Sequence, residues 1–404
     1  MSMIRPSDLV VIDADTHFSE PADLWTKRAP SSMKRLVPQV RKNNDGISHW
    51  YVNEDIDLGR AGGSSVIKVD GEKDSFWNQD IMAGMGLDDI HPGSYDVRAR
   101  LEVMDEQGVW AHIVYPNTLG FAAGRVLTLE NQDLSLAIIK TYNDALAEWQ
   151  AESGGRLLPQ AMLPFWDIDA TVDELVRIKS EFGMTGVTMT GEPFHAGLPD
   201  LADSHWDPMY EVCVDLGIPI NIHIGSSDGG SNLASSFGRV WPSQDRYRRY
   251  VLGCVQIELA NSNFLSNLCA SDLLVRWPAL KFVSVESGIG WIPYVLERTD
   301  YQLGEPVPDG VNLKERPSAW DLFRQSVYSC FWFEQSAPRH LIEDIGVDNV
   351  MFETDFPHPT CLYPNPVEHA LEQLAIGGHS EEVIRKLMGG NAIDLYNIQI
   401  PTPA

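Results

Sequence analysis

The chain is short of positive charge and contains no long run of Lys and Arg. Its 404 residues include 30 Lys and Arg against 57 Asp and Glu, which gives a formal net charge of −27 at pH 7. An acid excess of this size repels the phosphate backbone of nucleic acids and anionic lipid head groups. The composition therefore predicts a protein that binds neither nucleic acid nor membrane surfaces.

Long apolar runs and the features of a secretion signal are also missing from the sequence. No apolar stretch approaches the ~20 residues that a membrane-spanning helix needs. The opening MSMIRPSDLVVIDAD is too short and too acidic for a signal peptide. We therefore expect a cytoplasmic protein.

Cysteine is scarce, and its spacing argues against thiol-based sites. The chain has five cysteines, an odd number, and no Cys-x-x-Cys pair. A chain of this length does not need disulfide bonds to stabilise its core, and thiolate zinc sites use closely spaced pairs. We expect reduced thiols at Cys213, Cys254, Cys269, Cys330 and Cys361.

Short apolar runs alternate with amphipathic stretches along most of the chain, which predicts repeated strand–helix units. Most of these runs contain few polar residues, as in strands buried on both faces of a parallel sheet. Strands are expected at 9–14, 110–115, 158–163, 186–190, 218–224, 280–286 and 349–354. Helices are expected at 132–151, 170–181 and 206–215. The pattern favours an α/β fold, a (β/α)8 TIM barrel that forms a single domain over residues 1–404.

Three segments interrupt this alternation and are expected to be insertions. Residues 39–75 combine alternating and Gly-rich stretches, which predicts a β-hairpin insertion. Residues 226–250 open with the Gly/Ser-rich SSDGGSN, and residues 301–318 are rich in Pro and Gly. Loops that follow the strands form the catalytic face of such a barrel, so we expect these insertions to shape its mouth.

The most specific local feature is the first predicted strand, VIDADTHFSEP. Residues i and i+2 of a strand point to the same side, so Asp15 and His17 can converge on one point inside a barrel. A carboxylate and an imidazole placed in this way suit a divalent cation. Taken alone, the pair has a structural alternative, in which Asp15 caps a turn and His17 is a hydrogen-bonded core residue.

Ligand-type residues also end three later predicted strands. They are His223 in PINIHIG, Glu286 in FVSVESGIGW and Asp355 in FETDFPHP. A buried charge costs several kcal/mol unless it is compensated, so acids at these positions need a partner. Since strand ends meet at one face of a barrel, the residues together predict a metal site.

Long segments of the chain resemble the amidohydrolase superfamily, in the branch related to aminocarboxymuconate-semialdehyde decarboxylase and the aromatic-acid decarboxylases. The segments are DADTHFSEP, HWDPMYEVCVDLGIPINIHIG, FVSVESGIGWIPYVLERTD, ERPSAWDLF, VMFETDFPHP and RKLMGGNAIDLYNI. The resemblance covers nearly the whole chain and implies metal ligation by Asp15, His17, His223 and Asp355.

Glu286 departs from the pattern of this branch, which typically has a histidine on the sixth strand. Its carboxylate is a fifth ligand-type group and could bridge to a second cation or move protons. The fourth predicted strand reads GVTMTG, without the lysine that bridges two metals in other branches. The resemblance therefore leaves open whether one or two cations bind.

A cation at these residues would act as a Lewis acid and lower the pKa of bound water towards ~7. The resemblance gives Asp355 the role of proton acceptor, and Glu286 and His358 are candidates for moving protons or orienting the substrate. His358 lies between Pro357 and Pro359, so it could also be a simple loop residue. The leading hypothesis is a metal-dependent hydrolase or decarboxylase, zinc-loaded, that acts on a small carboxylic acid, with aromatic acids as one candidate class.

Two alternatives remain open from the sequence. The extra carboxylate of Glu286 motivates a dinuclear iron or manganese oxygenase on the same barrel. A non-catalytic partner subunit would keep the fold while another chain performs the chemistry. We also expect an oligomer, either of identical chains or with a paralogous subunit.

Other candidate residues have plain structural explanations beside their functional ones. Trp25 and Trp291 could wall an apolar substrate pocket or belong to the core. The cluster in DRYRRY could clamp a substrate carboxylate or form a solvated helix face. Its members are Arg246, Arg248 and Arg249. His112 and His205 are expected to be ordinary strand and helix-cap residues.

Overall fold

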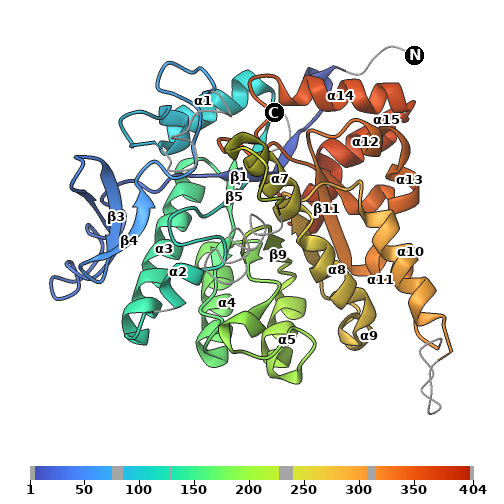
Figure 1. Ribbon diagram of the computed structural model, residues 1–404, viewed down its shortest axis with the longest axis horizontal. Coiled ribbons are helices and arrows are strands. Elements are labelled where there is room, and N and C mark those ends of the chain that lie inside the picture. The colour runs from blue at the N-terminus through green and yellow to red at the C-terminus, as the bar shows by residue number, and fades with distance from the viewer. Residues whose placement is uncertain (1–4, 75–84, 128, 227–239, 307–314, 401–404) are drawn as a thin grey trace. The chain divides into compact units, whose positions relative to one another are not determined.

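The computed structural model describes residues 5–74, 85–127, 129–226, 240–306 and 315–400 (Figure 1). The chain divides into two compact units. The N-terminal unit consists of Val11–Met189 and Glu353–Val367. The C-terminal unit consists of Met1–Val10, Thr190–Phe352 and Glu368–Ala404. The single domain expected over residues 1–404 stays a prediction.

The N-terminal unit contains two sets of parallel strands. The first has the order β1-β5-β6, in which His17 at the end of β1 pairs with Tyr115 at the end of β5. A second parallel pair is formed by β7 and β8. The bounds are β1 Ile12–His17, β5 Ala111–Tyr115, β6 Leu157–Pro159, β7 Ala161–Met162 and β8 Val187–Thr188. Every residue of β1 and β5 is buried, as their apolar runs predict.

The helices of this unit begin at side chains that cap their first backbone N–H groups. Asp96, Asn131 and Asp167 each accept a hydrogen bond from the N–H three residues later. The helices are α1 Val97–Gln107, α2 Gly124–Leu127, α3 Gln132–Glu152 and α4 Ile168–Phe182, with a 3₁₀ turn η3 at Pro92–Ser94. The predicted helices at 132–151 and 170–181 are therefore confirmed to within two residues at each end.

The insertion predicted at 39–75 contains a three-stranded antiparallel sheet in place of a simple hairpin. Its strands are β2 Gln39–Lys42, β3 Ser48–Val52 and β4 Ile56–Arg60, in the order β2-β3-β4. The additional strand follows a turn at Asn53 and Glu54, which both adopt left-handed backbone conformations. A turn made without Gly or Pro gives little signal in the sequence.

The C-terminal unit contains a parallel sheet with the order β12-β11-β10-β9. The strands are β9 Ile220–His223, β10 Phe282–Val285, β11 Val327–Phe331 and β12 Val350–Phe352. The sequence did not predict β11. The preceding helix ends at Ser326 and the strand begins at the next residue, so no Gly, Pro or loop marks the boundary.

Helices follow each strand of this sheet, and α10 packs against α8 and α11 (Figure 1). The α-helices along the chain are α5 Asp207–Leu216, α7 Arg246–Glu258, α8 Asn261–Ala270, α9 Leu273–Arg276, α10 Ile292–Leu303, α11 Ala319–Ser326, α12 Ser336–His340, α13 Ile342–Ile345, α14 Pro366–Gly377, α15 Glu381–Arg385 and α16 Asn391–Leu395. Shorter turns are η1 Pro6–Asp8, η4 Pro193–Ala196, η5 Ser204–Trp206, η8 Val347–Asn349 and the π-turn η9 Lys386–Gly390. Among the helices of the described segments, none is both long and apolar enough to cross a membrane.

Two of the predicted insertions lie partly outside the described residues. Residues 227–239 and 307–314, within the insertions expected at 226–250 and 301–318, are not described. The remainder of the first insertion includes the start of α7 at Arg246. The remainder of the second includes the end of α10 and Ser318, which caps α11.

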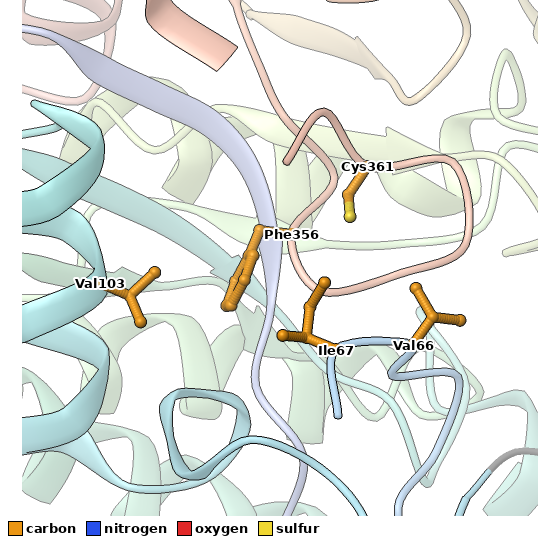
Figure 2. Close-up of a cluster of buried hydrophobic side chains, with 5 residues drawn as sticks. All are labelled: Val66, Ile67, Val103, Phe356 and Cys361. Carbon is orange, nitrogen blue, oxygen red and sulfur yellow. The ribbon is translucent and has the colours of Figure 1, made fainter. Parts of the chain in front are cut away.

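A small hydrophobic cluster holds the segment 353–367 inside the N-terminal unit. Figure 2 shows Phe356 and Cys361 from this segment beside Val66, Ile67 and Val103. All five side chains are at most 4% exposed. Backbone hydrogen bonding supports the packing, because the N–H of Val66 donates to the carbonyl of Pro357 over 2.9 Å. The stretch that follows β4 therefore positions the segment that carries Asp355.

Candidate metal and catalytic site

The end of β1 and the segment after β12 lie side by side through backbone hydrogen bonds. The N–H of His17 donates to the carbonyl of Phe356 over 2.7 Å, and the N–H of Asp355 donates to the carbonyl of Asp15 over 2.9 Å. These bonds extend the N-terminal sheet by a short parallel bridge between Thr16 and Phe356. Residues separated by more than 330 positions in the sequence are thereby fixed next to each other.

Four of the predicted site residues meet at this point, and all four side chains are buried. They are Asp15, His17, Asp355 and His358. His17 Nε2 lies 3.6 Å from Asp15 Oδ1 and 3.5 Å from Asp355 Oδ1. His358 Nδ1 lies 3.1 Å from the same Asp355 oxygen. Asp355 Oδ1 accepts no hydrogen bond from the described residues, whereas Oδ2 accepts one from Thr360 Oγ1. The lone pairs of this buried oxygen are therefore available to a cation or a proton.

The two histidines differ in how they can serve this group. Their rings are stacked, with centroids 3.6 Å apart and planes 16° from parallel. The lone pairs of an imidazole lie in the ring plane, so those of two stacked rings run side by side and do not converge on one cation. His17 faces both carboxylates and hydrogen-bonds through Nδ1 to the carbonyl of Pro116 at 3.4 Å, which suits a metal ligand. His358, whose Nδ1 lies 3.1 Å from Asp355 Oδ1, is better suited to orient that carboxylate than to bind the cation.

Electrostatics in this group favour a bound cation. Burial raises the pKa of Asp15 well above its usual value, and the charges of Asp355 and Asp13 raise it further. Burial also raises the pKa of Asp13 to about 7, although hydrogen bonds from Thr354 oppose the shift. Buried carboxylates this close repel one another, and a divalent cation would remove the cost. The donor set therefore fits a metal ion.

Arg100 is the buried cation behind these acids. Its Nη2 donates to the carbonyl of His17 over 2.5 Å, and its guanidinium stacks on the ring of Phe356 at 4.7 Å. Burial lowers the pKa of Arg100 to about 9. His112 lies 3.3 Å from Arg100, and its pKa is lowered well below the usual value by burial and by that guanidinium. A neutral His112 adds no charge, and the carboxylate that acts on the Arg100 guanidinium is that of Asp13.

The C-terminal unit holds the other two predicted ligands. His223 is the last residue of β9, and Glu286 directly follows β10. The two strands pair in parallel, with His223 opposite Val285, and His223 Nε2 lies 3.3 Å from Glu286 Oε2. The other ring nitrogen, Nδ1, hydrogen-bonds to the carbonyl of Ile224 at 2.8 Å. The imidazole is thus oriented with Nε2 towards the carboxylate.

Both strand-end acids adopt a backbone conformation that L-residues rarely take. The φ angle is 53° at Glu286 and 60° at Asp355. Left-handed backbone at a non-glycine residue costs roughly 1–3 kcal/mol, and such residues cluster at functional sites as well as occurring in turns. Its occurrence at the two acids singled out by sequence supports a functional role for both.

Three residues near these groups were not identified from the sequence. Glu334 accepts hydrogen bonds from the N–H groups of Ile289 and Gly290, at the loop between Glu286 and α10, and burial raises its pKa to about 7. An acid shortly after a strand would have pointed to Glu334, but the sequence did not predict that strand, β11. The other two are Glu20 and Asn117, whose partners lie far away in the sequence.

The remaining candidate residues have structural roles. Trp25 is fully buried and donates from Nε1 to the carbonyl of Ile138 over 3.1 Å, whereas Trp291 is half-buried and donates to Ser287 over 2.7 Å. His205 lies in η5, where Asp203 caps its N–H. The three arginines of DRYRRY are exposed in the first turn of α7, as a solvated helix face would be. All five cysteines are free, as expected.

Comparison with known proteins identifies relatives over almost the whole chain. The family model described as Amidohydrolase matches residues 12–398. The γ-resorcylate decarboxylase of Rhodococcus jostii (strain RHA1) is 25% identical over 332 residues, which cover 79% of this chain and 93% of the relative. Sequence and structure thus point to the same family.

Solved structures share the fold. An amidohydrolase from Mycobacterium avium subsp. paratuberculosis K-10 is 22% identical with a TM-score of 0.70, covering 97% of this chain and 99% of that one. A dihydroxybenzoic acid decarboxylase from Polaromonas sp. JS666, solved with manganese and the inhibitor 2-nitroresorcinol, is 18% identical with a TM-score of 0.60, covering 96% and 97%. The likeness confirms the predicted (β/α)8 TIM-barrel fold.

Proposed function

Because the chain belongs to the amidohydrolase family, we propose that it is a metal-dependent decarboxylase of a small hydroxylated aromatic acid. The observation that carries the proposal is the buried group of Asp15, His17 and Asp355, whose repelling carboxylates suit a divalent cation. The relatives named as decarboxylases of resorcylate and dihydroxybenzoate support this substrate class. Hydrolysis of a related acid is the neighbouring reaction that the same donor set would support.

We propose that Asp15, His17 and Asp355 hold the metal in the N-terminal unit. Ligation by His223 and Glu286, which lie together in the C-terminal unit, stays a prediction. A divalent cation supplies Lewis acidity towards a substrate oxygen. Manganese in the Polaromonas structure favours that metal for the first assays, and zinc stays a prediction to be tested beside it.

Decarboxylation replaces a carboxylate on the ring by a proton. The carbon–carbon bond breaks, carbon dioxide leaves, and the ring carbon must receive one proton from the protein or solvent. Asp355 is placed to hold that proton on Oδ1, the oxygen that accepts no hydrogen bond. His358 Nδ1, 3.1 Å away, can stabilise either protonation state of Asp355.

The test is an assay for carbon dioxide release from γ-resorcylate by protein loaded with Mn²⁺ or Zn²⁺. We expect turnover in which the product ring takes up one proton for each carbon dioxide released. Removal of the metal with a chelator should abolish this turnover. Benzoate, which lacks the hydroxyl groups, serves as the control substrate and should not react. Full activity in metal-free protein, or no reaction with any hydroxylated aromatic acid, would contradict the proposal.

We also infer that the chain assembles with a second copy through α7. Three apolar residues along one stripe of this helix are 36–45% exposed: Val251, Val255 and Leu259. The first turn of the same helix carries three exposed arginines, which would reduce the repulsion between two strongly acidic chains. In a dimer with a two-fold axis, the stripe of one chain would pack against the same stripe of the other chain. Val255→Asp should shift the mass measured by light scattering from dimer to monomer, and an unchanged mass would refute the inference.

The thiols support the expected cytoplasmic location. Burial raises the pKa of Cys213, Cys269 and Cys361 to about 12, so each stays a protonated thiol at neutral pH. Such thiols are inert and require no oxidising compartment.

A further inference from the structure

Asn117 is the direct partner of His358 on the side away from Asp355. His358 Nε2 lies 2.7 Å from Asn117 Oδ1, while His358 Nδ1 lies 3.1 Å from Asp355 Oδ1. The two ring nitrogens are thus anchored at opposite edges. Stacking on His17 fixes the plane of the ring as well. An imidazole held at both nitrogens and on one face has a single orientation.

Glu20 in turn holds the backbone that carries Asn117. Its Oε1 accepts hydrogen bonds from the N–H groups of Asn117 and Thr118, at 3.1 and 3.0 Å. Its Oε2 accepts a third from Thr118 Oγ1 at 2.6 Å. Burial raises the pKa of Glu20, and the hydrogen bonds from Thr118 and Asn117 oppose this shift. The loop after β5 therefore has a fixed position from which the Asn117 side chain reaches His358.

The amide of Asn117 can serve either tautomer of His358. Its Oδ1 accepts a hydrogen bond when Nε2 carries the proton, and its Nδ2 could donate one when Nε2 does not. Nδ2 is buried and has no hydrogen-bond partner among the described residues. A half-turn of the amide therefore exchanges the two arrangements without breaking any other hydrogen bond. A side chain that only accepts or only donates would restrict His358 to one tautomer.

We propose that Asn117 is a positioning residue that keeps His358 Nδ1 directed at Asp355 in both tautomers, and that Glu20 holds Asn117 in place for this task. The inference rests on the proposed function, since it assigns Asn117 a role through the His358 ring that faces Asp355. Without the hydrogen bond to Nε2, the ring can turn about its χ2 angle and present a carbon to Asp355. The 3.1 Å contact between His358 Nδ1 and Asp355 Oδ1 would then be lost.

The test compares two variants of nearly equal size. Asn117→Leu removes both the donor and the acceptor, whereas Asn117→Asp keeps an acceptor for a protonated Nε2. In Asn117→Leu we expect kcat for γ-resorcylate to fall about 10- to 100-fold, the usual loss when the partner of a catalytic or ligating histidine is removed, with KM changed less than twofold. Asn117→Asp should recover part of the lost kcat.

A second readout follows the ring itself and needs no substrate. In protein labelled with ¹⁵N-histidine, long-range ¹H–¹⁵N spectra distinguish the tautomers, and His358→Gln identifies the His358 signals. We expect one tautomer, with Nε2 protonated, in Asn117→Asp, and averaged or broadened signals in Asn117→Leu. The Mn²⁺ content should stay within twofold of the parent protein in both variants.

Asn143→Leu is the matched control. Asn143 is another buried amide of the N-terminal unit, bonded to Met162 and Glu174, and its loss should lower the melting temperature while leaving the His358 signals and kcat unchanged. Unchanged His358 signals in Asn117→Leu, or equal kcat in the Leu and Asp variants, would overturn the inference. If no aromatic acid reacts, the proposed function fails, and the spectra still decide the role of Asn117.

Discussion

The two halves of the predicted ligand set, one in each unit, are built in different ways. In the N-terminal unit, Asp355 is held by a backbone bond to β1, by Phe356 in the hydrophobic cluster of Figure 2 and by the hydrogen bond that its Oδ2 accepts from Thr360. In the C-terminal unit, the pairing of β9 with β10 brings His223 and Glu286 together, and Asn261 Nδ2 donates to a carbonyl of each strand. The first half depends on contacts between distant segments and the second on strand register. Substitutions should therefore act differently in the two units.

The largest effect is expected at Asp355 itself. Asp355→Asn keeps the shape of the side chain but removes the charge and the proton acceptor, so kcat should fall by about 10²–10⁴-fold, the range for loss of an acid–base group. Metal content should also fall, because the variant has one carboxylate fewer for the cation to neutralise. Both are measured on protein whose melting temperature shows that it is folded. A variant with more than a tenth of the parent kcat would exclude Asp355 from proton transfer.

Phe356→Ala tests whether the hydrophobic cluster supports Asp355. Removing a fully buried phenylalanine side chain usually costs about 3–5 kcal/mol of unfolding free energy, which chemical denaturation measures. The loss of packing should also lower metal affinity, since Asp355 is the adjacent residue. Phe323→Ala, in α11 of the C-terminal unit, is the control and should cost similar stability without changing metal affinity. Equal metal affinity in the two variants would show that the cluster has no influence on the site.

The ligand-type residues could be predicted because each ends a recognisable strand. The alternation of Asp15 and His17 and the apolar runs before His223, Glu286 and Asp355 are local signals. The structure places these residues in two close groups, one in each unit. The (β/α)8 fold could likewise be predicted, because it depends on the same repeated runs.

The supporting residues could not be predicted, because their partners are not local. Glu20 meets Asn117 across 97 positions, and Asn117 meets His358 across 241. No pattern of hydrophobicity reports such pairs. Glu334 was missed for another reason, since the strand before it begins directly after a helix and leaves no boundary in the sequence.

His223→Ala tests whether the C-terminal half contributes to the same metal site. If it does, the affinity for Mn²⁺ should fall by at least about 100-fold, more than the loss typical of a residue that only supports a ligand. Stability without metal should change less than in Phe356→Ala, because strand register holds this half. Competition with a chelator measures the affinity. Unchanged metal affinity would confine the site to the N-terminal unit.

The smallest effect is expected at Glu334, and it depends on pH. The pKa of Glu334 is raised by burial from its ordinary 4.5 to about 7, so the folded protein binds more protons than the unfolded chain between these values. The free energy of unfolding should therefore fall as pH rises from 4.5 to 7 and lose no more above that, at most about 3 kcal/mol from this residue. Glu334→Gln keeps an acceptor for the N–H groups of Ile289 and Gly290 but does not titrate, so its stability relative to the parent should rise across this window. Because Asp13 titrates in a similar range in the N-terminal unit, only the difference between parent and variant isolates Glu334. If the difference in unfolding free energy between parent and variant stayed constant from pH 4.5 to 8, Glu334 would have the same pKa in the folded and unfolded protein. Its carboxylate would then support the loop that carries Glu286 without a cost for burying its charge.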